Sequence, residues 1–163
     1  WIAGVENPES VAEHSFRTAA IAYLLAKLEG ADAGRVTLMA LFHDLGEART
    51  NDLHRIVLRY VNWENVDQQV IKDQSKRLPA HISEEMISLL SEFEETISLE
   101  ARIARDADLL ECLVQAREYQ ALGYEVADWI SNAKAALVTD SAKRIAEECL
   151  GTEPKEWWQG LKA

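Results

Sequence analysis

Hydrophobic residues along this chain recur at steps of three and four, and strict alternation of apolar and polar residues is scarce. Steps of three and four place side chains on one face of an α-helix. The first clear stripe contains Val11, His14, Thr18, Ile21, Leu25 and Leu28. The pattern predicts an all-α protein, with His14 on a face of its first helix that is turned toward the core.

Local signals predict where the helices begin and end. Ser10 and Glu13 match a capping box, in which the serine oxygen accepts the Glu13 amide hydrogen and the Glu13 side chain reaches back. Gly30 is a typical stop signal for that helix. Further helices are expected over about 32–46, up to 63 after a looser stretch at 51–54, over 66–77, from 83, over 98–122, over 126–137 and over 142–150, with a short turn after Pro154.

The whole chain is expected to form one domain. It has 163 residues with only 7 Gly and 3 Pro, and it contains neither a low-complexity linker nor a repeat. This length is ordinary for one domain. We therefore expect residues 1–163 to form a single helical bundle. Because the chain begins with Trp1 rather than Met, further residues upstream are also expected.

Charge and composition exclude some classes of partner. The formal net charge of −11 opposes binding to long nucleic acid, although a bound dication can reverse the field locally for a small phosphorylated substrate. The sequence contains no uninterrupted run of about 18 apolar residues, so no membrane span is expected. Cys112 and Cys149 are too far apart for a disulfide framework and are expected to be buried thiols in a reducing compartment, which favours a cytoplasmic protein.

Three segments carry residues suited to metal chemistry. His43 and Asp44 come at the end of an apolar helix, where adjacent side chains can both reach an ion beyond the terminus. Asp108 lies among small residues in the middle of a long helix, and a buried carboxylate there needs a cation or a base. His14, on the first helix, is the third candidate. Two of these residues have plainer interpretations: His14 can be a hydrogen-bonded core histidine, and Asp108 can be the salt-bridge partner of Arg105 or another base. Asp106 is expected on the exposed side.

Taken together, His14, His43, Asp44 and Asp108 supply two imidazoles and two carboxylates. This ligand set suits a divalent cation such as Mn, Co, Fe, Ni, Zn or Mg. Four protein ligands around an octahedral ion leave two positions for water and a phosphate oxygen, which is typical of a catalytic site. Asp44 is also placed to hold the attacking water.

The order H…HD…D resembles the signature of the HD-domain superfamily. The likeness is closest to the YfbR-type 5′-deoxyribonucleotidases and their archaeal relatives, and it extends from Trp1 to about Leu122. It is carried by Asn7-Pro8-Glu9-Ser10-Val11-Ala12-Glu13-His14-Ser15-Phe16-Arg17, by His43-Asp44-Leu45-Gly46-Glu47 and by Asn51-Asp52. The resemblance implies an all-helical bundle with the metal site between core helices. It also implies a homodimer that removes the 5′-phosphate of nucleoside monophosphates with a divalent cation.

The resemblance also implies roles for individual residues. By position, His14, His43, Asp44 and Asp108 match the metal ligands. Glu47 matches the catalytic carboxylate or a ligand of a second ion. Asp52 matches an acid near the sugar or a second cation, the carbonyl of Leu53 a further ligand in some relatives, and Trp1 a tryptophan of the substrate pocket. The family places a basic residue near that tryptophan to orient the phosphate, whereas Ile2, Ala3 and Gly4 follow Trp1 here. That residue is expected upstream of Trp1. Arg17 is expected to have a structural role.

Two alternative functions stay open at this point. One is another HD phosphohydrolase, acting on cyclic nucleotides, (p)ppGpp or nucleoside triphosphates with the same metal ligands. The other is a non-catalytic metal-binding regulatory module that uses the tryptophan-rich end around Trp157 and Trp158 to bind a protein. Glu47 also has a plainer interpretation, as a solvated surface acid.

Overall fold

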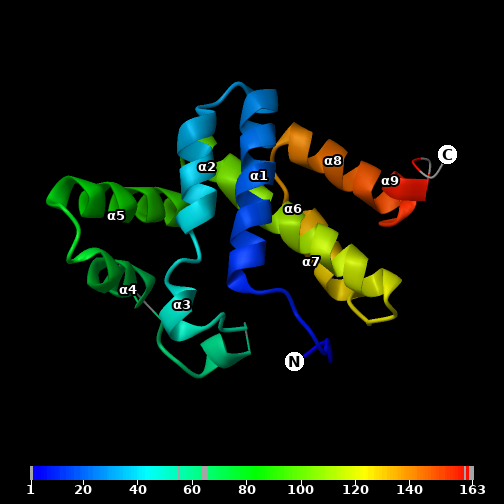
Figure 1. Ribbon diagram of the computed structural model, residues 1–163, viewed down its shortest axis with the longest axis horizontal. Helices are drawn as coiled ribbons and strands as arrows, with labels where there is room; N and C mark the ends of the chain where they lie inside the picture. The colour runs from blue at the N-terminus through cyan, green and yellow to red at the C-terminus, as the bar shows by residue number, and fades with distance from the viewer. Residues whose placement is uncertain (1, 55, 64–65, 160, 162–163) are drawn as a thin grey trace.

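The described part of the chain is helical and contains no β-strand (Figure 1). The computed structural model describes all residues except 1, 55, 64–65, 160 and 162–163. In chain order, the elements are α1 (Val11–Glu29), α2 (Ala33–Phe42), α3 (Glu47–Thr50), the 3₁₀ turn η1 (Val57–Arg59), α4 (Val66–Ser75), α5 (Ala80–Glu95), α6 (Leu99–Ala121), α7 (Ala127–Ala136), α8 (Asp140–Gly151) and α9 (Glu156–Gln159). The prediction of an all-α fold is confirmed.

Local signals account for most helix limits. The Ser10 hydroxyl accepts the Glu13 amide hydrogen at 3.3 Å, and Glu13 Oε2 accepts the Ser10 amide hydrogen at 2.8 Å, so the predicted capping box is present. Gly30 ends α1 in the left-handed conformation, with a φ of 73°. Three limits differ from the prediction by more than two residues. α2 ends at Phe42 rather than at about residue 46. α5 begins directly after Pro79, because the fixed φ of proline fits a helix start, and the region before residue 63 forms only the short α3 and η1.

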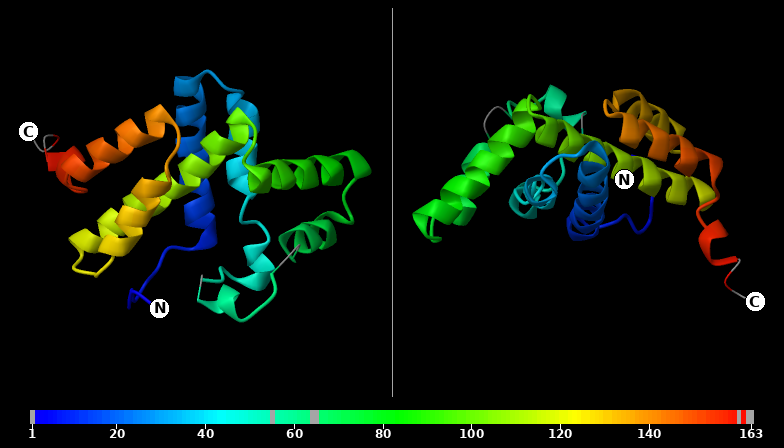
Figure 2. Two further views of the ribbon diagram at one scale, coloured as in Figure 1. Left: turned by 180° about the vertical axis from the view of Figure 1, so that it is seen from behind. Right: turned by 90° about the horizontal axis from the view of Figure 1, so that it is seen from above.

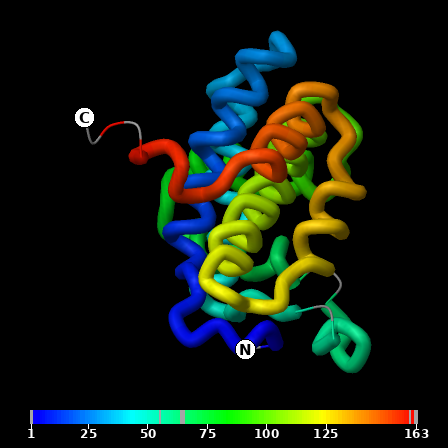
Figure 3. The backbone as a smooth tube through the Cα atoms, turned by 90° about the vertical axis from the view of Figure 1, so that its right-hand side faces the viewer, coloured from blue at the N-terminus to red at the C-terminus, as the bar shows by residue number. Residues whose placement is uncertain are grey.

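α6 is the central element of the bundle. It contacts α1, α2, α5, α7 and α8. α1 and α2 lie side by side across one face of α6, and α7 folds back along it (Figures 1 and 2). Figure 3 shows α6 between α1 on one side and α7 on the other. None of the described helices is long and apolar enough to span a bilayer.

Small residues allow α1 and α6 to pack closely. Ala22 and Ala26 on α1 and Ala104 and Ala107 on α6 are fully buried and belong to one core cluster. Alanines at a helix crossing permit short interaxial distances. Leu110 anchors the same cluster at 1% exposure, and its truncation to alanine is expected to cost about 2–5 kcal/mol. This packing brings the start of α1 next to the middle of α6.

The predictions for three polar residues are wrong. Asp106 is only 1% exposed rather than solvated. Its carboxylate accepts hydrogen bonds from the amide of Val138 at 3.0 Å and from the amide of Thr139 at 2.7 Å, because the loop between α7 and α8 covers this side of α6. Cys112 is exposed and Cys149 half-buried, whereas both thiols were expected in the core. The Sγ of Cys112 nevertheless lies 3.9 Å from Oδ1 of Asp108, and burial raises the pKa of the thiol to about 12.

Candidate metal centre

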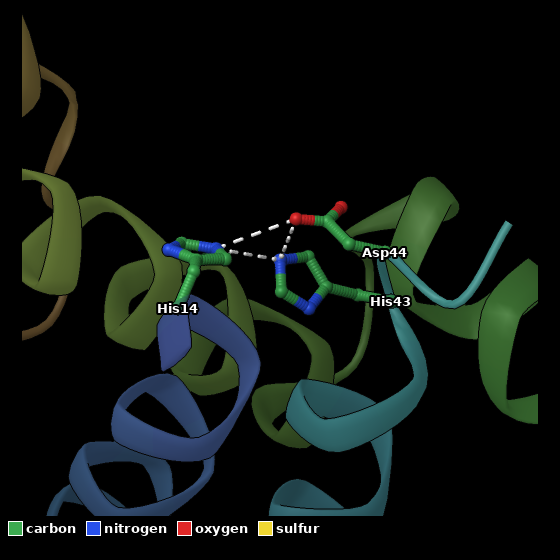
Figure 4. Close-up of side chains that lie close together, drawn as sticks. All are labelled: His14, His43 and Asp44. Atoms are coloured by element: carbon green, nitrogen blue, oxygen red, sulfur yellow. Dashed lines mark hydrogen bonds and ion pairs between the residues drawn. The ribbon is translucent and has the colours of Figure 1, made fainter. Parts of the chain in front are cut away.

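His14 and His43 meet between α1 and the end of α2, and their Nε2 atoms are 3.3 Å apart (Figure 4). The Nδ1 of His43 donates to the carbonyl oxygen of Ala40 at 2.8 Å. The Nδ1 of His14 donates to Oε2 of Glu111 at 2.6 Å. Since each Nδ1 is engaged with an acceptor, each Nε2 is the atom left to face the centre. Two imidazole nitrogens therefore converge with the orientation that a metal ion requires.

Two carboxylates complete the cluster. Oδ2 of Asp44 lies 3.4 Å from His14 Nε2 and 3.1 Å from His43 Nε2. Oδ1 of Asp108 lies 3.4 Å and 3.7 Å from the same two atoms. The four side chains come from α1, from the end of α2 and from α6, and all are at least partly buried. Each of the two carboxylates thus has an oxygen within 3.7 Å of both imidazole Nε2 atoms, and two nitrogens with two hard oxygens form a donor set that fits a divalent cation.

The electrostatics of the chain alone show how strongly these groups depend on one another. Burial disfavours the imidazolium of His43, but hydrogen bonds to Asp108 and Asp44 outweigh it and raise the pKa of His43 to about 9. Burial would raise the pKa of Asp44, but the two histidines lower it to about 2. The same balance raises the pKa of His14 and lowers that of Asp108. A bound cation would take the place of the two protons that hold the carboxylates here.

Behind His14 lies a carboxylate that the sequence analysis missed. Glu111 is fully buried, and besides contacting His14 its Oε1 accepts a hydrogen bond from Arg17 Nε at 2.6 Å. Arg17 is held further by Glu118 at 3.0 Å and by Gln115 at 2.6 Å, which agrees with its expected structural role. A carboxylate on the outer nitrogen of a ligand histidine fixes the ring and raises its basicity. The available signal was the spacing of Glu111, three residues after Asp108 on the same helix.

The cluster opens onto a cavity of about 440 Å³. The predicted residues that line it are His43, Asp44, Glu47, Asp52 and Leu53, whereas Trp1 lies outside the described residues. Glu47 begins α3 at the rim. Burial, followed by the charges of Asp44 and Asp52, raises the pKa of Glu47 to about 8. This carboxyl group is therefore half-buried and protonated near neutral pH, which contradicts its interpretation as a solvated acid.

Arg105 is the only arginine or lysine among the described residues that line this cavity. Its Nη1 lies 3.3 Å from Oδ2 of Asp108, the oxygen of that carboxylate that does not face the histidines. The guanidinium stacks over the ring of Phe93, 5.3 Å from its centroid. The side chain stays 49% exposed, so it can contact a ligand in the cavity. The partnership of Arg105 and Asp108 thus coexists with the clustering of Asp108 and the histidines.

Comparisons with known proteins agree with this geometry. A family model described as HD domain matches residues 1–149. The 5′-deoxynucleotidase HDDC2 of Dictyostelium discoideum is 31% identical over 126 residues, which are 72% of this chain and 66% of the relative. The protein of the same name from Bos taurus is 31% identical over 125 residues, which are 75% of this chain and 60% of the relative. The chain thus spans less than two thirds of each of these relatives.

A solved structure extends the likeness to nearly the whole fold. A conserved hypothetical protein from Pyrococcus furiosus superposes with a TM-score of 0.75 at 33% identity, over 93% of this chain and 88% of that one.

Proposed function

Because the chain belongs to the HD-domain family, we propose that it is a divalent-metal-dependent phosphohydrolase that removes the 5′-phosphate of deoxyribonucleoside or ribonucleoside monophosphates. The observation that carries the proposal is the convergence of His14, His43, Asp44 and Asp108 at the edge of a 440 Å³ cavity. The relatives named 5′-deoxynucleotidase support this reaction and this substrate class.

The proposed ligands are His14, His43, Asp44 and Asp108. A divalent cation held there, such as Co, Mn, Mg, Ni, Fe or Zn, would supply Lewis-acid activation of water and neutralise charge on the phosphoryl oxygens. Asp44 orients the attacking water from the rim of the cavity. Asp52 and the carbonyl of Leu53 line the same cavity and are proposed to contact the sugar or a second ion.

Glu47 is proposed as the acid for the departing 5′-oxygen. In the chain without a cation, burial and the charges of Asp44 and Asp52 raise the pKa of Glu47 to about 8, and a general acid must hold its proton before the bond breaks. The side chain lines the same cavity as Asp44, so the residue proposed to orient the attacking water and the residue proposed to protonate the leaving group face one space. Trp1 is proposed to contact the substrate from outside the described residues.

Arg105 is proposed to bind a phosphoryl oxygen. Among the described residues, the carboxylates of Asp44, Asp52, Asp67 and Glu94 line the cavity and repel a phosphate dianion. A guanidinium matches phosphate geometry, and Arg105 contacts the Asp108 carboxylate of the cluster directly. This placement supplies a basic group within the chain where the sequence analysis expected one upstream of Trp1.

The test is phosphate release from the full set of nucleoside and deoxynucleoside monophosphates with each cation in turn. Wild-type protein should release phosphate. The Asp44→Ala variant should release none, and calorimetry should show that it binds the cation more weakly than wild type. Asp73→Ala, which removes an exposed carboxylate on α4, should behave as wild type. Hydrolysis of cyclic nucleotides, (p)ppGpp or triphosphates alone would establish the other HD phosphohydrolase instead. Cation binding without release from any nucleotide would establish the regulatory module.

We also propose a homodimer, a cytoplasmic location and a single domain over residues 1–163. The resemblance supports the dimer, and the far-apart cysteines are typical of a reducing compartment. The net charge of −11 favours a small substrate over long nucleic acid.

A further inference from the structure

Trp63 brings an aromatic ring to the wall of the cavity beside the metal centre. The residue lies just before α4, and its carbonyl oxygen accepts the amide hydrogen of Val66 at 3.1 Å, which ties it to the start of that helix. Its Nε1 donates to both carboxylate oxygens of Asp67, at 3.3 Å and 3.2 Å. Because the one polar atom of the indole is satisfied by this neighbour, the side chain offers a ligand its aromatic surface.

α4 holds this ring close to the proposed cation site. The side-chain amide of Gln74 donates to the carbonyl oxygen of Leu45 at 3.0 Å. A Cβ added at Gly46 would lie 4.0 Å from Oδ1 of Asp67, the same carboxylate that accepts the indole hydrogen bond. Leu45 and Gly46 directly follow the proposed metal ligands at the end of α2. The packing of α4 on this turn therefore fixes Trp63 relative to the metal centre.

The two phenylalanines that line the cavity serve the metal centre and the core instead. The ring of Phe93 lies under the guanidinium of Arg105, 5.3 Å from its centroid, and its centroid is 5.0 Å from that of His43. Phe42 is partly buried and packs against the core cluster from α2. Trp63 comes from the segment between η1 and α4, so it is the aromatic residue best placed to meet a ligand.

The charges along the cavity give a phosphorylated ligand one orientation. Arg105, the only lysine or arginine among the described residues of the lining, lies at the metal cluster. Asp67 on α4 and Glu94 on α5 also line the cavity, and Gln68 donates to Glu94 at 3.1 Å. These two acids repel a phosphate dianion, whereas an uncharged ring can lie against them. The phosphate therefore belongs at the metal cluster and an uncharged group belongs at Trp63.

We propose that Trp63 is the stacking platform for the nucleobase, so that the cavity selects phosphomonoesters that carry a base over sugar phosphates that lack one. This inference rests on the proposed nucleotidase function and deepens it. Stacking on an aromatic side chain tolerates any base, because every base has a π-face. The cavity volume of about 440 Å³ is within the range of sites that enclose small-molecule ligands. The platform thus recognises that a base is present without distinguishing one base from another.

The test compares phosphate release, with Mn²⁺, from deoxyadenosine monophosphate and from 2-deoxyribose 5-phosphate, which has the same phosphoester but no base. Wild type is measured beside Trp63→Phe and Trp63→Leu. Both substitutions remove the hydrogen bond to Asp67, but only phenylalanine keeps a ring. Trp157→Ala, a change at an exposed tryptophan on α9, is the control and should behave as wild type. Circular dichroism should show the same helical signal in all four proteins, because Trp63 lies outside the helices and is only half-buried.

Wild type is expected to have a lower KM for deoxyadenosine monophosphate than for the sugar phosphate. Trp63→Leu should raise the KM for the nucleotide roughly 5–150-fold, which is the range for the loss of one stacked base. Its kcat should change little, because the base stacks equally in the bound substrate and in the transition state. Trp63→Phe should keep most of the affinity for the nucleotide. The KM for the sugar phosphate should be the same in all four proteins, because it has no base to stack.

Equal KM values of Trp63→Phe and Trp63→Leu for the nucleotide would overturn the platform and leave the phosphatase proposal standing. A parallel rise of both KM values in Trp63→Leu would also overturn it, because Trp63 would then only support the cavity. A wild type that releases no phosphate refutes the proposed function, and calorimetric binding of the two compounds to the Mn²⁺-loaded proteins then decides the platform. Weaker binding of the nucleotide by Trp63→Leu than by Trp63→Phe would support it, and equal binding would overturn it.

Discussion

Replacing Glu111 with glutamine removes the negative charge behind His14 and keeps the shape of the side chain. The carboxylate is fully buried and bonds His14 Nδ1 at 2.6 Å and Arg17 Nε at 2.6 Å. Hydrogen bonds to charged groups contribute about 1.5–3 kcal/mol each. Loss of such an outer partner typically costs about 10–100-fold in metal affinity, which corresponds to roughly 1.4–2.8 kcal/mol.

The assay is calorimetric titration of Mn²⁺ or Co²⁺ into protein that has been stripped of metal with a chelator and then freed of the chelator. Glu111→Gln is expected to bind about 10–100-fold more weakly than wild type. Glu118→Gln serves as the control, because Glu118 also pairs with Arg17 at 3.0 Å but makes no hydrogen bond to His14. Nitrogen NMR of His14 gives a second readout, since the amide of glutamine can donate to Nδ1 and shift the proton to Nε2.

The two readouts separate positioning from simple loss of stability. A Glu111→Gln protein that binds the cation as wild type does, with His14 still protonated at Nδ1, would refute the reasoning. Weaker binding with the same loss in Glu118→Gln would assign the effect to Arg17 rather than to His14.

Three further predictions follow from the geometry. Glu47→Gln is expected to reduce phosphate release about 10²–10⁴-fold, while cation affinity by calorimetry changes little; unaltered turnover would remove Glu47 from the mechanism. Asp106→Asn should lower the free energy of unfolding by about 1–3 kcal/mol, measured in urea, because it weakens the acceptor for the amides that begin α8. For chelated protein, His43 with its raised pKa contributes stability that is complete below pH 6.5 and lost as the pH rises through about 9. Asp44, with its lowered pKa, contributes stability present above pH 3.8 and lost as the pH falls through about 2. Melting temperatures with a chelator should therefore fall from pH 6.5 toward 9, whereas stabilisation by added Mn²⁺ should grow over the same range because the imidazoles lose protons. A chelated protein whose melting temperature rises over that range would contradict the arrangement of the cluster.

The local features of this protein could be predicted from its sequence because they depend on neighbouring residues. The helical spacing of apolar residues, the capping box of Ser10 and Glu13 and the stop at Gly30 act within a few residues. The His43-Asp44 pair and its spacing from His14 and Asp108 indicated the metal chemistry. The pattern of α1 correctly predicts the burial of Thr18 and Leu25, whereas Leu28 on the same predicted stripe is 60% exposed.

Tertiary packing decided what surrounds each polar group. Asp106 and Asp108 are two residues apart on α6, and both are largely shielded from solvent. Asp106 meets the loop before α8, whereas Asp108 meets the histidines and Arg105. Burial of Asp106 depends on a segment 32 residues away in sequence, so helical periodicity could not reveal it.

The same reason explains why Glu111 and Arg105 were not recognised as parts of the site. From sequence alone, a charged residue on a helix is expected to face solvent, because only the tertiary structure shows whether another helix covers it. The sequence by itself determined which side chains are able to bind a cation. Only the crossing of α1 and α2 over α6 decided that they share one centre, that Glu111 orients His14 and that Arg105 faces the cavity, because these contacts join residues from separate helices.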